Sequence, residues 1–212
     1  MIVLSVEPRW VSPYVFACFV TLREKELPFE IQVLDAAKGE TRSEEHLAQT
    51  FTGRVPSLLH DEFGLSESTA IVEYLEEMYP EKPVLPQTPR DRARCRQLMS
   101  WIRSDETAAL RSERSTTTMF YPTERAKAPL SPEAKASADK LCTIATRLIR
   151  PGEPNIFPAW SIIDSELAFI LHRLILNDDP VPEKVRAWAE EQWHRPSVRE
   201  FIERERPIDA HP

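Results

Sequence analysis

Two short segments constrain most strongly what this chain can fold into. In the first, Val55-Pro56 opens a short apolar run. Proline cannot donate a hydrogen bond to a sheet, so it occupies strand starts, edges and bulges. A cis peptide bond at a strand start would leave the backbone N–H and C=O of Val55 to pair with an extended peptide, as an added strand does. Taken alone, an ordinary edge proline explains this segment more simply.

The second segment, Glu67-Ser68, opens a predicted helix over residues 68–79. The free N–H groups at a helix N-terminus, together with a hydroxyl, are suited to holding a carboxylate. The Glu67 carboxylate beside them can hold an ammonium group. Taken alone, an ordinary capped helix explains this segment more simply. Together the two segments suit the amino-acid end of a small peptide ligand.

Charge and composition exclude several classes of function. The chain of 212 residues has a formal net charge of -7, which argues against a nonspecific nucleic-acid binder, since such a protein needs a basic face. Its four glycines, at positions 39, 53, 64 and 152, are too scattered for a glycine-rich phosphate loop. The five histidines, at positions 46, 60, 172, 194 and 211, have no metal-ligand spacing. We therefore expect neither a nucleic-acid partner nor a metal.

Cysteine usage and the N-terminus indicate a cytoplasmic protein. Cys18, Cys95 and Cys142 are odd in number and far apart, which is typical of reduced core thiols. Residues 1–6 have no basic segment and are too short for the apolar core of a signal peptide. No apolar run approaches the roughly 20 residues that cross a membrane. We therefore expect a cytoplasmic protein with no membrane partner.

The first 80 residues show the mixed periodicity of an α/β domain. Apolar alternation predicts strands, and apolar residues at helical spacing predict helices. The predicted elements are a strand at 2–6, a helix from Ser12-Pro13 to about Leu27, a strand at 29–33, a short helix at 43–50, strands at 55–59 and 62–65, and a helix at 68–79. The first two strands should be parallel, with a right-handed crossover.

The remainder of the chain is predicted to be helical. Prolines at positions 80, 83, 86 and 89 oppose helix formation and mark a stiff linker at 81–90. Ser161 and Asp164 form the acidic version of a capping box, at the start of a very apolar helix that should be the buried axis of this domain. The other predicted helices of the all-α domain, 91–212, lie at 91–115, 132–150, 181–194 and 196–205.

Taken jointly, these segments resemble the cytosolic glutathione S-transferases. The N-terminal part carries Arg54-Val55-Pro56-Ser57-Leu58 and the run Glu67-Ser68-Thr69-Ala70-Ile71-Val72-Glu73-Tyr74-Leu75, similar to the family's ESxAIxxYL. The helical part carries the family's capping motif, Ser161-Ile162-Ile163-Asp164. The resemblance covers nearly the whole chain. It implies the glutathione S-transferase fold, an α/β thioredoxin-like N-terminal domain (1–80) followed by an all-α C-terminal helical domain.

A finer resemblance is to the bacterial YfcF-type transferases, which we take to be of the serine type. It is carried by Ser12-Pro13-Tyr14-Val15, Leu22-Arg23-Glu24-Lys25 and Trp101-Ile102-Arg103-Ser104-Asp105.

The resemblance implies that the peptide ligand is glutathione, used as a co-substrate, with no permanently bound cofactor. Val55 would pair backbone to backbone with the cysteinyl residue of glutathione, across a cis-Pro56. Glu67 and Ser68 would hold the γ-glutamyl end. These roles agree with those inferred from the residues themselves.

Ser12 is the residue on which the predicted chemistry depends. The thiol of glutathione titrates near the free-cysteine value of roughly 8.5, and only the thiolate is a good nucleophile. A hydroxyl in the first turn of a helix can stabilise the thiolate with a hydrogen bond, helped by neighbouring N–H groups and the helix dipole. Transferases of the serine type place a serine there. Ser12 could instead be only an N-cap, and Ser5 is a weaker alternative for the activating group.

The tetrad Ser12-Pro13-Tyr14-Val15 resembles the Cys-Pro-Tyr-Cys of glutaredoxins with both sulfurs removed. A thiol redox enzyme needs a cysteine at the first position. Cys18, the only cysteine nearby, falls on a different face of the predicted helix. The protein should therefore use glutathione itself as the nucleophile.

Other candidate site residues carry a weaker signal. Arg42 and Arg54 could contact the glycyl carboxylate of glutathione, as basic residues do at similar places in the family; solvated surface is nearly as compatible. Asp105 could reach the γ-glutamyl amine in a partner subunit. Candidates for the second-substrate pocket are Trp10, Tyr14, Arg111 and Arg114.

Three functional hypotheses follow. The first is an enzyme, a homodimeric transferase that conjugates glutathione to electrophiles or reduces organic hydroperoxides. The second is a non-catalytic protein of the same fold that binds glutathione or other ligands. The third is a relative with a translation-factor or chaperone-like role, which the absence of a long appended domain or basic patch disfavours. The identity of the second substrate is not encoded in any motif.

Overall fold

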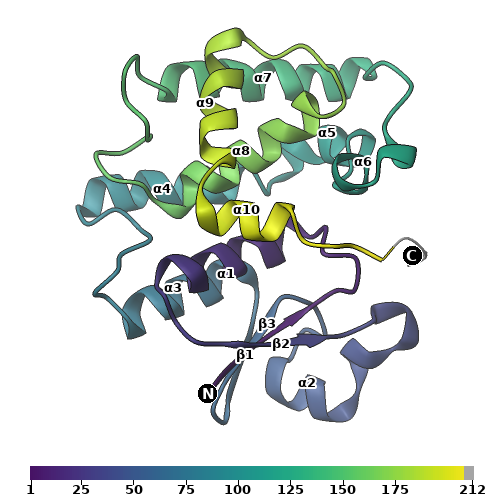
Figure 1. Ribbon diagram of the computed structural model, residues 1–212, viewed down its shortest axis with the longest axis vertical. Helices are drawn as coiled ribbons and strands as arrows, with labels where there is room; N and C mark the ends of the chain where they lie inside the picture. Colours follow the sequence, from purple (N-terminus) through teal and green to yellow (C-terminus); the bar gives the residue numbers. More distant parts are fainter. Residues whose placement is uncertain (208–212) are drawn as a thin grey trace. The chain divides into compact units, whose positions relative to one another are not determined.

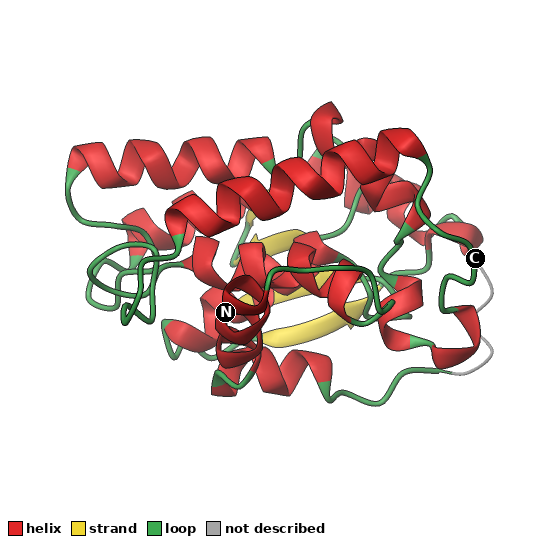
Figure 2. Ribbon diagram, turned by 90° about the horizontal axis from the view of Figure 1, so that it is seen from above, coloured by secondary structure: helices red, strands yellow, loops and turns green. Residues whose placement is uncertain are grey.

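The structure is a computed structural model that describes residues 1–207. It contains two compact units, each described here by itself (Figure 1). Unit 1 consists of Met1–Val84 together with the described residues from Arg199 onward, and unit 2 is Leu85–Val198. Unit 1 holds a small sheet with helices, whereas unit 2 is helical (Figure 2). The predicted fold class is confirmed.

Unit 1 is built on a four-stranded sheet of order β2-β1-β3-β4. The β1–β2 pair is parallel, as predicted, and the β1–β3 and β3–β4 pairs are antiparallel. Each predicted strand and helix of this region is present. The elements are β1 (Ile2–Val6), α1 (Pro13–Glu24), β2 (Glu30–Val33), η1 (Ala36–Lys38), η2 (Glu40–Arg42), α2 (Glu44–Thr50), β3 (Ser57–His60), β4 (Phe63–Ser66) and α3 (Ser68–Met78).

The register of the sheet brings distant segments to one of its ends. Ser5 near the end of β1 lies opposite Ser57 at the start of β3, and Ser57 lies opposite Ser66 at the end of β4. The segments that leave β1, enter β3 and leave β4 therefore meet at the same end of the sheet. These are the segments that lead to Ser12, Val55 and Glu67.

The core of unit 1 lies between α1 and the elements that pack on it. Helix α1 buries the continuous run from Val15 to Leu22, and it contacts α3. Phe201, near the end of α10 (Pro196–Ile202), packs edge-on against Trp10 and Phe16. This aromatic packing explains why the residues after Val198 group with unit 1, although the sequence analysis assigned them to the helical domain.

A buried ion pair fixes the chain that leaves α3. Lys25 Nζ lies 2.8 Å from the Glu76 carboxylate, and both side chains are almost fully buried. Lys25 also donates to the carbonyls of Tyr79 and Lys82, while Glu76 accepts the Val84 N–H. Because each charge has several hydrogen-bond partners, the cost of burying the pair is offset. The start of the proline-rich linker is therefore held in place rather than free.

Unit 2 is organised around α8 (Ile162–Ile175), in which every residue is buried. The buried axis that the sequence predicted is thus confirmed. The remaining elements of this unit that lie before α10 are α4 (Pro89–Trp101), η3 (Asp105–Thr107), α5 (Ala108–Glu113), α6 (Thr117–Phe120), η4 (Pro122–Glu124), α7 (Pro132–Leu148) and α9 (Glu183–Trp193).

The prediction of a single helix at 91–115 is wrong, because the helix is interrupted between α4, which ends at Trp101, and η3, which begins at Asp105. Side chains donate hydrogen bonds to backbone carbonyls that a continued helix would pair with backbone N–H groups. The Ser104 hydroxyl donates to the Trp101 carbonyl, and the Thr107 hydroxyl donates to that of Ile102. Arg111 donates to the carbonyls of residues 103 and 104. Hydroxyl groups that donate to nearby backbone carbonyls compete in this way with the hydrogen bonds of a helix.

Two further features bear on the sequence analysis. Cys18, Cys95 and Cys142 are free and buried, so the prediction of core thiols is confirmed. Burial raises the pKa of the Cys142 thiol to about 11, which keeps it protonated and unreactive. Within residues 1–207, no helix has both the length and the apolar character needed to cross a membrane.

Candidate functional site

The N-terminus of α3 is open. Glu67 is the N-cap residue, but its side chain makes no capping hydrogen bond. The first intrahelical bond runs from the Ile71 N–H to the Glu67 carbonyl, at 3.0 Å. The N–H groups of the first turn, from Ser68 to Ala70, therefore have no side-chain acceptor among the described residues. An uncapped helix N-terminus of this kind carries a partial positive charge and suits a carboxylate ligand.

The backbone of Glu67 is held in an uncommon conformation. Its φ is 70° and its ψ is 111°, in a region that non-glycine residues rarely adopt. The preceding residue is fixed by a hydroxyl chain, in which Thr52 Oγ1 donates to Ser66 Oγ and Ser66 Oγ donates to the Thr50 carbonyl. Such conformations persist where the surroundings impose them, and they occur often at ligand sites. The exposed carboxylate of Glu67 is thereby presented beside the open helix end.

The Val55–Pro56 peptide bond is cis, as the sequence analysis expected. Strand β3 begins only at Ser57, so Val55 lies just outside the hydrogen-bonded ladder of the sheet. Pro56 is buried and Val55 is partly exposed. This placement matches the requirement for backbone pairing with an extended peptide.

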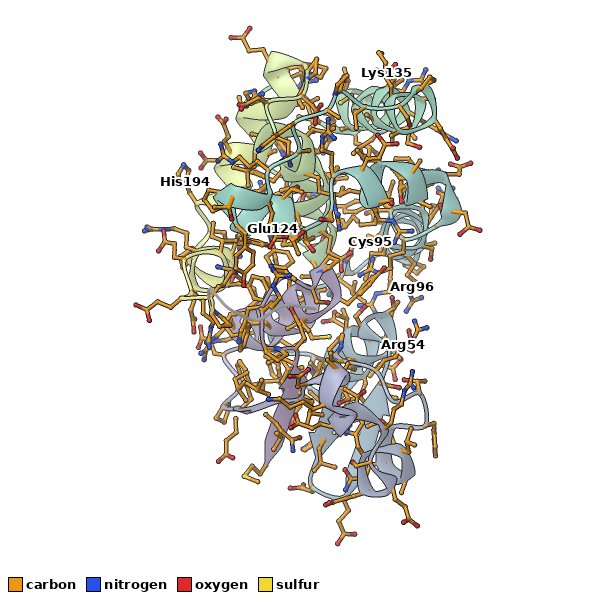
Figure 3. All side chains as sticks on the ribbon, turned by 90° about the vertical axis from the view of Figure 1, so that its right-hand side faces the viewer. Arg54, Cys95, Arg96, Glu124, Lys135 and His194 are labelled. Carbon is orange, nitrogen blue, oxygen red and sulfur yellow. The ribbon has the colours of Figure 1, made fainter. Side chains whose placement is uncertain are left out.

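Arg42 and Arg54 are both exposed residues of unit 1, and Figure 3 labels Arg54. Gly53, which directly precedes Arg54, has a φ of +60°. A Cβ on Gly53 would lie 2.9 Å from the Thr41 carbonyl oxygen and 3.9 Å from Arg42 Cγ. The backbone at Gly53 thus packs closely on the segment of Thr41 and Arg42, directly before Arg54 and Val55.

The N-terminus of α1, in contrast, is closed from within. Ser12 Oγ accepts the N–H groups of Tyr14 and Val15, both at 3.2 Å. Glu7 Oε1 accepts the N–H of Val11 at 2.5 Å and that of Ser12 at 2.7 Å. The expectation that N–H groups here also face the ligand is therefore wrong, because other atoms of the chain already accept them. The Ser12 hydroxyl proton has no acceptor within residues 1–207, so it is the donor that remains.

Glu7 is a site residue that the sequence analysis missed. Burial raises the pKa of its carboxyl, while the Ser12 and Val11 N–H groups and the positive charge of Arg206 act in the opposite direction. Its Oε2 is buried and has no hydrogen-bond partner within the described residues. The available signal was its spacing to Ser12, which lets a carboxylate reach back to a helix N-terminus, but no motif marks it.

Two of the proposed pocket residues near α1 have different surroundings. Trp10 is buried, lies edge-on to Phe19 and Phe201, and is covered by Arg204. It therefore belongs to the core of unit 1. Tyr14, in the first turn of α1, is only partly buried.

The two arginines proposed for the second-substrate pocket have partners within unit 2. Arg114 is buried and donates to both carboxylate oxygens of Asp179, at 2.5 and 2.9 Å, and to the Ala128 carbonyl. Arg111 donates to the backbone where α4 ends. Their observed role is to tie loops together. Asp105 is exposed, in the 3-10 turn η3 rather than within a helix.

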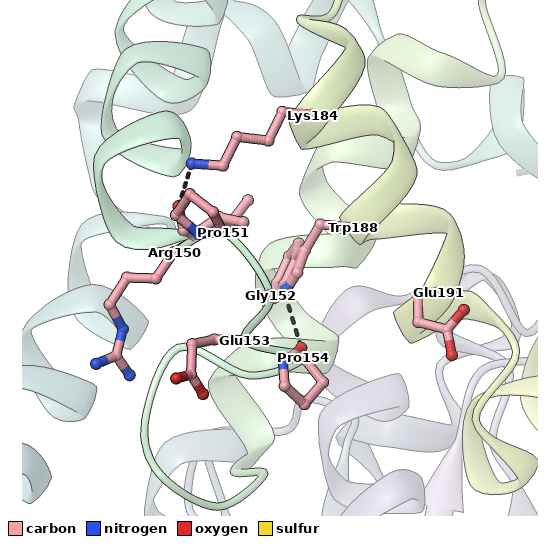
Figure 4. A pocket seen from close by; sticks show the side chains of 9 residues that line it. Arg150, Pro151, Gly152, Glu153, Pro154, Lys184, Trp188 and Glu191 are labelled. Atoms are coloured by element: carbon pink, nitrogen blue, oxygen red, sulfur yellow. Dashed lines mark hydrogen bonds between the residues drawn. The ribbon is translucent and has the colours of Figure 1, made fainter.

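A shallow depression of about 520 Å³ lies in unit 2 between the end of α7 and α9 (Figure 4). Lys184 donates to the Ile149 carbonyl there, and Trp188 donates to the Pro154 carbonyl at 2.9 Å. Two of its donors therefore already have acceptors in the chain. Within residues 1–207, no group of three His, Cys, Asp or Glu side chains could hold a metal ion; His211 lies outside the described residues.

Comparison with known proteins decides the family. Residues 11–78 match the sequence model described as glutathione S-transferase, N-terminal domain, and residues 89–206 match that described as glutathione S-transferase, C-terminal domain. The chain belongs to the glutathione S-transferase family. The chain is similar, over most of its length, to a solved glutathione transferase homolog from Burkholderia with bound glutathione. The identity is 39%, the coverage is 95% of this chain and 96% of that one, and the TM-score is 0.78.

Curated relatives add a broader picture. The chain is 27% identical over 187 residues to glutathione S-transferase GstB of Escherichia coli, covering 86% of this chain and 89% of that protein. It is 42% identical over 74 residues to glutathione S-transferase 1 of Dianthus caryophyllus, which is 35% of this chain and 34% of that protein. It is 34% identical over 98 residues to maleylacetoacetate isomerase of Dictyostelium discoideum, which is 45% of each. The chain therefore spans less than half the length of these last two relatives.

Proposed function

We propose that this transferase binds glutathione at the end of its sheet and activates the thiol with Ser12. The observation that carries the proposal is the register of the sheet, which brings the segments of Ser12, Val55 and Glu67 to one end of the sheet. A similar chain, the homolog from Burkholderia, was solved with glutathione bound.

Each part of glutathione has a matching group. The γ-glutamyl carboxylate is placed at the open N-terminus of α3, with the hydroxyl of Ser68, and the γ-glutamyl ammonium is placed at Glu67. The cysteinyl backbone pairs with Val55, next to the cis-Pro56 bond. The glycyl carboxylate is placed near the exposed guanidinium groups of Arg42 and Arg54.

The chemistry follows from the donor left at α1. The thiol proton leaves to solvent, and the Ser12 hydroxyl donates to the sulfur anion. This hydrogen bond favours the charged form of the thiol and lowers its pKa. The thiolate then attacks an electrophile, and the new carbon–sulfur bond displaces the leaving group with its electron pair. With an organic hydroperoxide, the thiolate attacks the terminal oxygen, so that a sulfur–oxygen bond forms, the oxygen–oxygen bond breaks and the alkoxide takes up a proton and leaves as the alcohol. The thiol of a second glutathione then displaces water from the resulting sulfenic acid, which gives oxidised glutathione.

The assignment to the serine type, closest to the YfcF-type transferases, is part of this proposal. Ser12 stands where glutaredoxins carry their first cysteine. Ser12→Cys should therefore gain thiol–disulfide exchange and form a mixed disulfide with oxidised glutathione. Mass measurement of the intact variant, without reductant, detects the adduct. Wild-type protein, whose three cysteines are buried, is the matched control and should remain unmodified.

A panel of second substrates tests the reaction. Aryl halides and electrophilic alkenes measure conjugation, and organic hydroperoxides measure reduction. A second candidate, glutathione-dependent isomerisation of maleylacetoacetate, is favoured by the relatives that carry the name maleylacetoacetate isomerase. Turnover of at least one substrate that depends on both glutathione and Ser12 supports the proposal. Glutathione binding without turnover across the panel supports the non-catalytic alternative.

We also propose a cytoplasmic homodimer in which Asp105 of one subunit reaches the γ-glutamyl amine held by the other. Unit 1 exposes Phe51 (85% exposed) and Met78 (50%), apolar surface that association would cover. Light scattering at micromolar concentration should give a dimer mass for wild type and a shift toward monomer for Phe51→Ser. A monomer mass for wild type would contradict this part of the proposal.

A further inference from the structure

The carboxylate of Glu7 fills the inside of the turn between β1 and α1. The side chain begins directly after β1 ends at Val6, and its Oε1 accepts two consecutive N–H groups, those of Val11 and Ser12. The backbone of Glu7 takes part as well, since its carbonyl accepts the Trp10 N–H at 3.4 Å. The turn that delivers Ser12 to the helix is therefore organised around one residue.

The same turn is held from its outer side. Trp10 has a φ of 52°, and its carbonyl accepts Arg206 Nε at 3.2 Å. A non-glycine residue in this region of φ is unfavourable unless its surroundings impose it. The two N–H groups that Glu7 accepts would otherwise be left without an acceptor in a partly buried turn, which destabilises that arrangement of the chain.

We propose that Glu7 is the positioning residue of the sulfur site: by accepting the N–H groups of Val11 and Ser12, its carboxylate fixes the turn so that the Ser12 hydroxyl is the donor presented to the glutathione sulfur. This inference rests on the proposed function. It assigns Glu7 no contact with the substrate.

The charge of Glu7 has a second, opposing effect. Strand β1 has no charged side chain, the first turn of α1 contributes the phenol of Tyr14, the loop contributes Arg9, and the C-terminal segment faces the carboxylate with Arg206. A fixed negative charge near the developing thiolate disfavours it. Positioning therefore requires the acceptor oxygen of Glu7, whereas its charge works against activation.

Substitutions that separate the acceptor from the charge test the proposal. Glu7→Gln keeps an acceptor oxygen of the same reach and removes the charge; Glu7→Asp keeps the charge but is one methylene shorter; Glu7→Ala removes both. The exposed Glu62→Gln is the matched control. For each variant we would measure kcat, the KM for glutathione, and the pKa of the bound thiol from thiolate absorbance.

Glu7→Ala should lower kcat to within about threefold of Ser12→Ala, because one change misplaces the Ser12 hydroxyl and the other removes it, so that the sulfur loses the same hydrogen bond. The KM for glutathione should change little. The double variant Glu7→Ala/Ser12→Ala should be no worse than Ser12→Ala alone. Glu7→Gln should keep most of kcat and lower the pKa of the bound thiol by about half a unit. Wild-type kcat in Glu7→Ala, or losses that multiply in the double variant, would overturn the inference.

If Glu7→Ala does not fold, the order of the other two variants decides. Retained kcat in Glu7→Gln with a large loss in Glu7→Asp supports positioning, and the reverse order overturns it. The proposed function fails separately, if the thiol of glutathione bound to wild type is no more acidic than that of free glutathione. A thiol pKa that is lowered in a Ser12-dependent way, with all Glu7 variants like wild type, overturns only the role of Glu7.

Discussion

The N-termini of α1 and α3 lie at the same end of one sheet, yet they differ in whether side chains accept the N–H groups near the helix start. At α3 the N-cap side chain makes no hydrogen bond, so the first-turn N–H groups are open. At α1 the Ser12 hydroxyl oxygen and the Glu7 carboxylate accept four N–H groups between them. Two helix N-termini with the same dipole are therefore prepared for different tasks.

The difference shows what each helix can offer a ligand. The open N-terminus of α3 offers charge complementarity, which suits a carboxylate that is already ionised. The closed N-terminus of α1 offers a single hydroxyl proton in a fixed direction. A single directed donor suits an anion that forms only during activation, as a thiolate does. Binding and activation are thereby assigned to separate helices.

The largest expected effect tests the activation side of this division. Ser12→Ala removes the one donor left at α1, so turnover with glutathione should fall roughly ten- to a thousandfold, as for the loss of one oxyanion-type donor. The affinity for glutathione should change little, because α3, Val55 and Glu67 remain. Steady-state kinetics and calorimetry measure the two quantities. Full activity in Ser12→Ala, with loss on changing Ser5 or Tyr14, would show that Ser12 only caps the helix.

The next effect concerns a third helix N-terminus, that of α8, which is closed for structural reasons alone. Asp164 accepts the N–H groups of Ser161 at 2.8 Å and Ile156 at 2.7 Å, and burial raises its pKa from 3.8 to about 6. A carboxyl whose pKa is raised by folding stabilises the protein below its unfolded pKa, and this contribution is lost as pH rises through the folded pKa.

The stability of wild type relative to Asp164→Asn should therefore increase by about 2 kcal/mol when the pH falls from 7 to 4, most of the full effect, which is complete only below the unfolded pKa. Urea unfolding at several pH values measures this difference, and the comparison with Asn removes the titration of other groups. A stability difference that does not change with pH would show that the pKa of Asp164 is not raised.

Removal of Glu67 tests the binding side of the comparison. Glu67→Ala should weaken glutathione binding by about 2 kcal/mol, because the ligand ammonium loses its partner. The exposed Glu77→Ala, on the same helix, is the matched control and should bind like wild type. Calorimetry gives both affinities. Wild-type affinity in Glu67→Ala would place the γ-glutamyl end elsewhere.

The smallest effect separates capping from catalysis at Ser12. Loss of its two N–H acceptor bonds in Ser12→Ala should lower the free energy of unfolding by about 1 kcal/mol, a usual value for an N-cap. Ser43→Ala, which removes the Ser43 Oγ acceptor of the His46 N–H at the start of α2, should cause a similar loss without lowering kcat. A comparable loss of kcat in Ser43→Ala would mean that general loosening, not the missing donor, explains the Ser12 result.

The sequence predicted the elements of unit 1 because their signals are local, whereas the cis bond at Pro56 was expected from the resemblance to the glutathione S-transferases. Pro56 in an apolar run and the alternation of the strands need no knowledge of distant residues. The role of Glu7 could not be predicted in this way, since a single glutamate after a strand has no characteristic pattern. Whether a helix N-terminus is open or closed depends on which side chains reach it, and only the structure shows this.

The break after α4 illustrates the same limit in unit 2. Apolar residues at helical spacing continue through 91–115, so periodicity predicts one helix. The hydroxyls of Ser104 and Thr107 nevertheless take over carbonyls at the helix end. The competition between side chain and backbone is decided by local geometry that periodicity does not encode.

The most direct test of the account is the pKa of the glutathione thiol in the bound state, measured by thiolate absorbance for wild type and Ser12→Ala at saturating glutathione. The account predicts a pKa well below the roughly 8.5 of a free thiol in wild type, and a return toward that value in Ser12→Ala with binding intact. An unshifted pKa in wild type, or an equally lowered pKa in both proteins, would contradict the claim that the Ser12 hydroxyl activates the thiol.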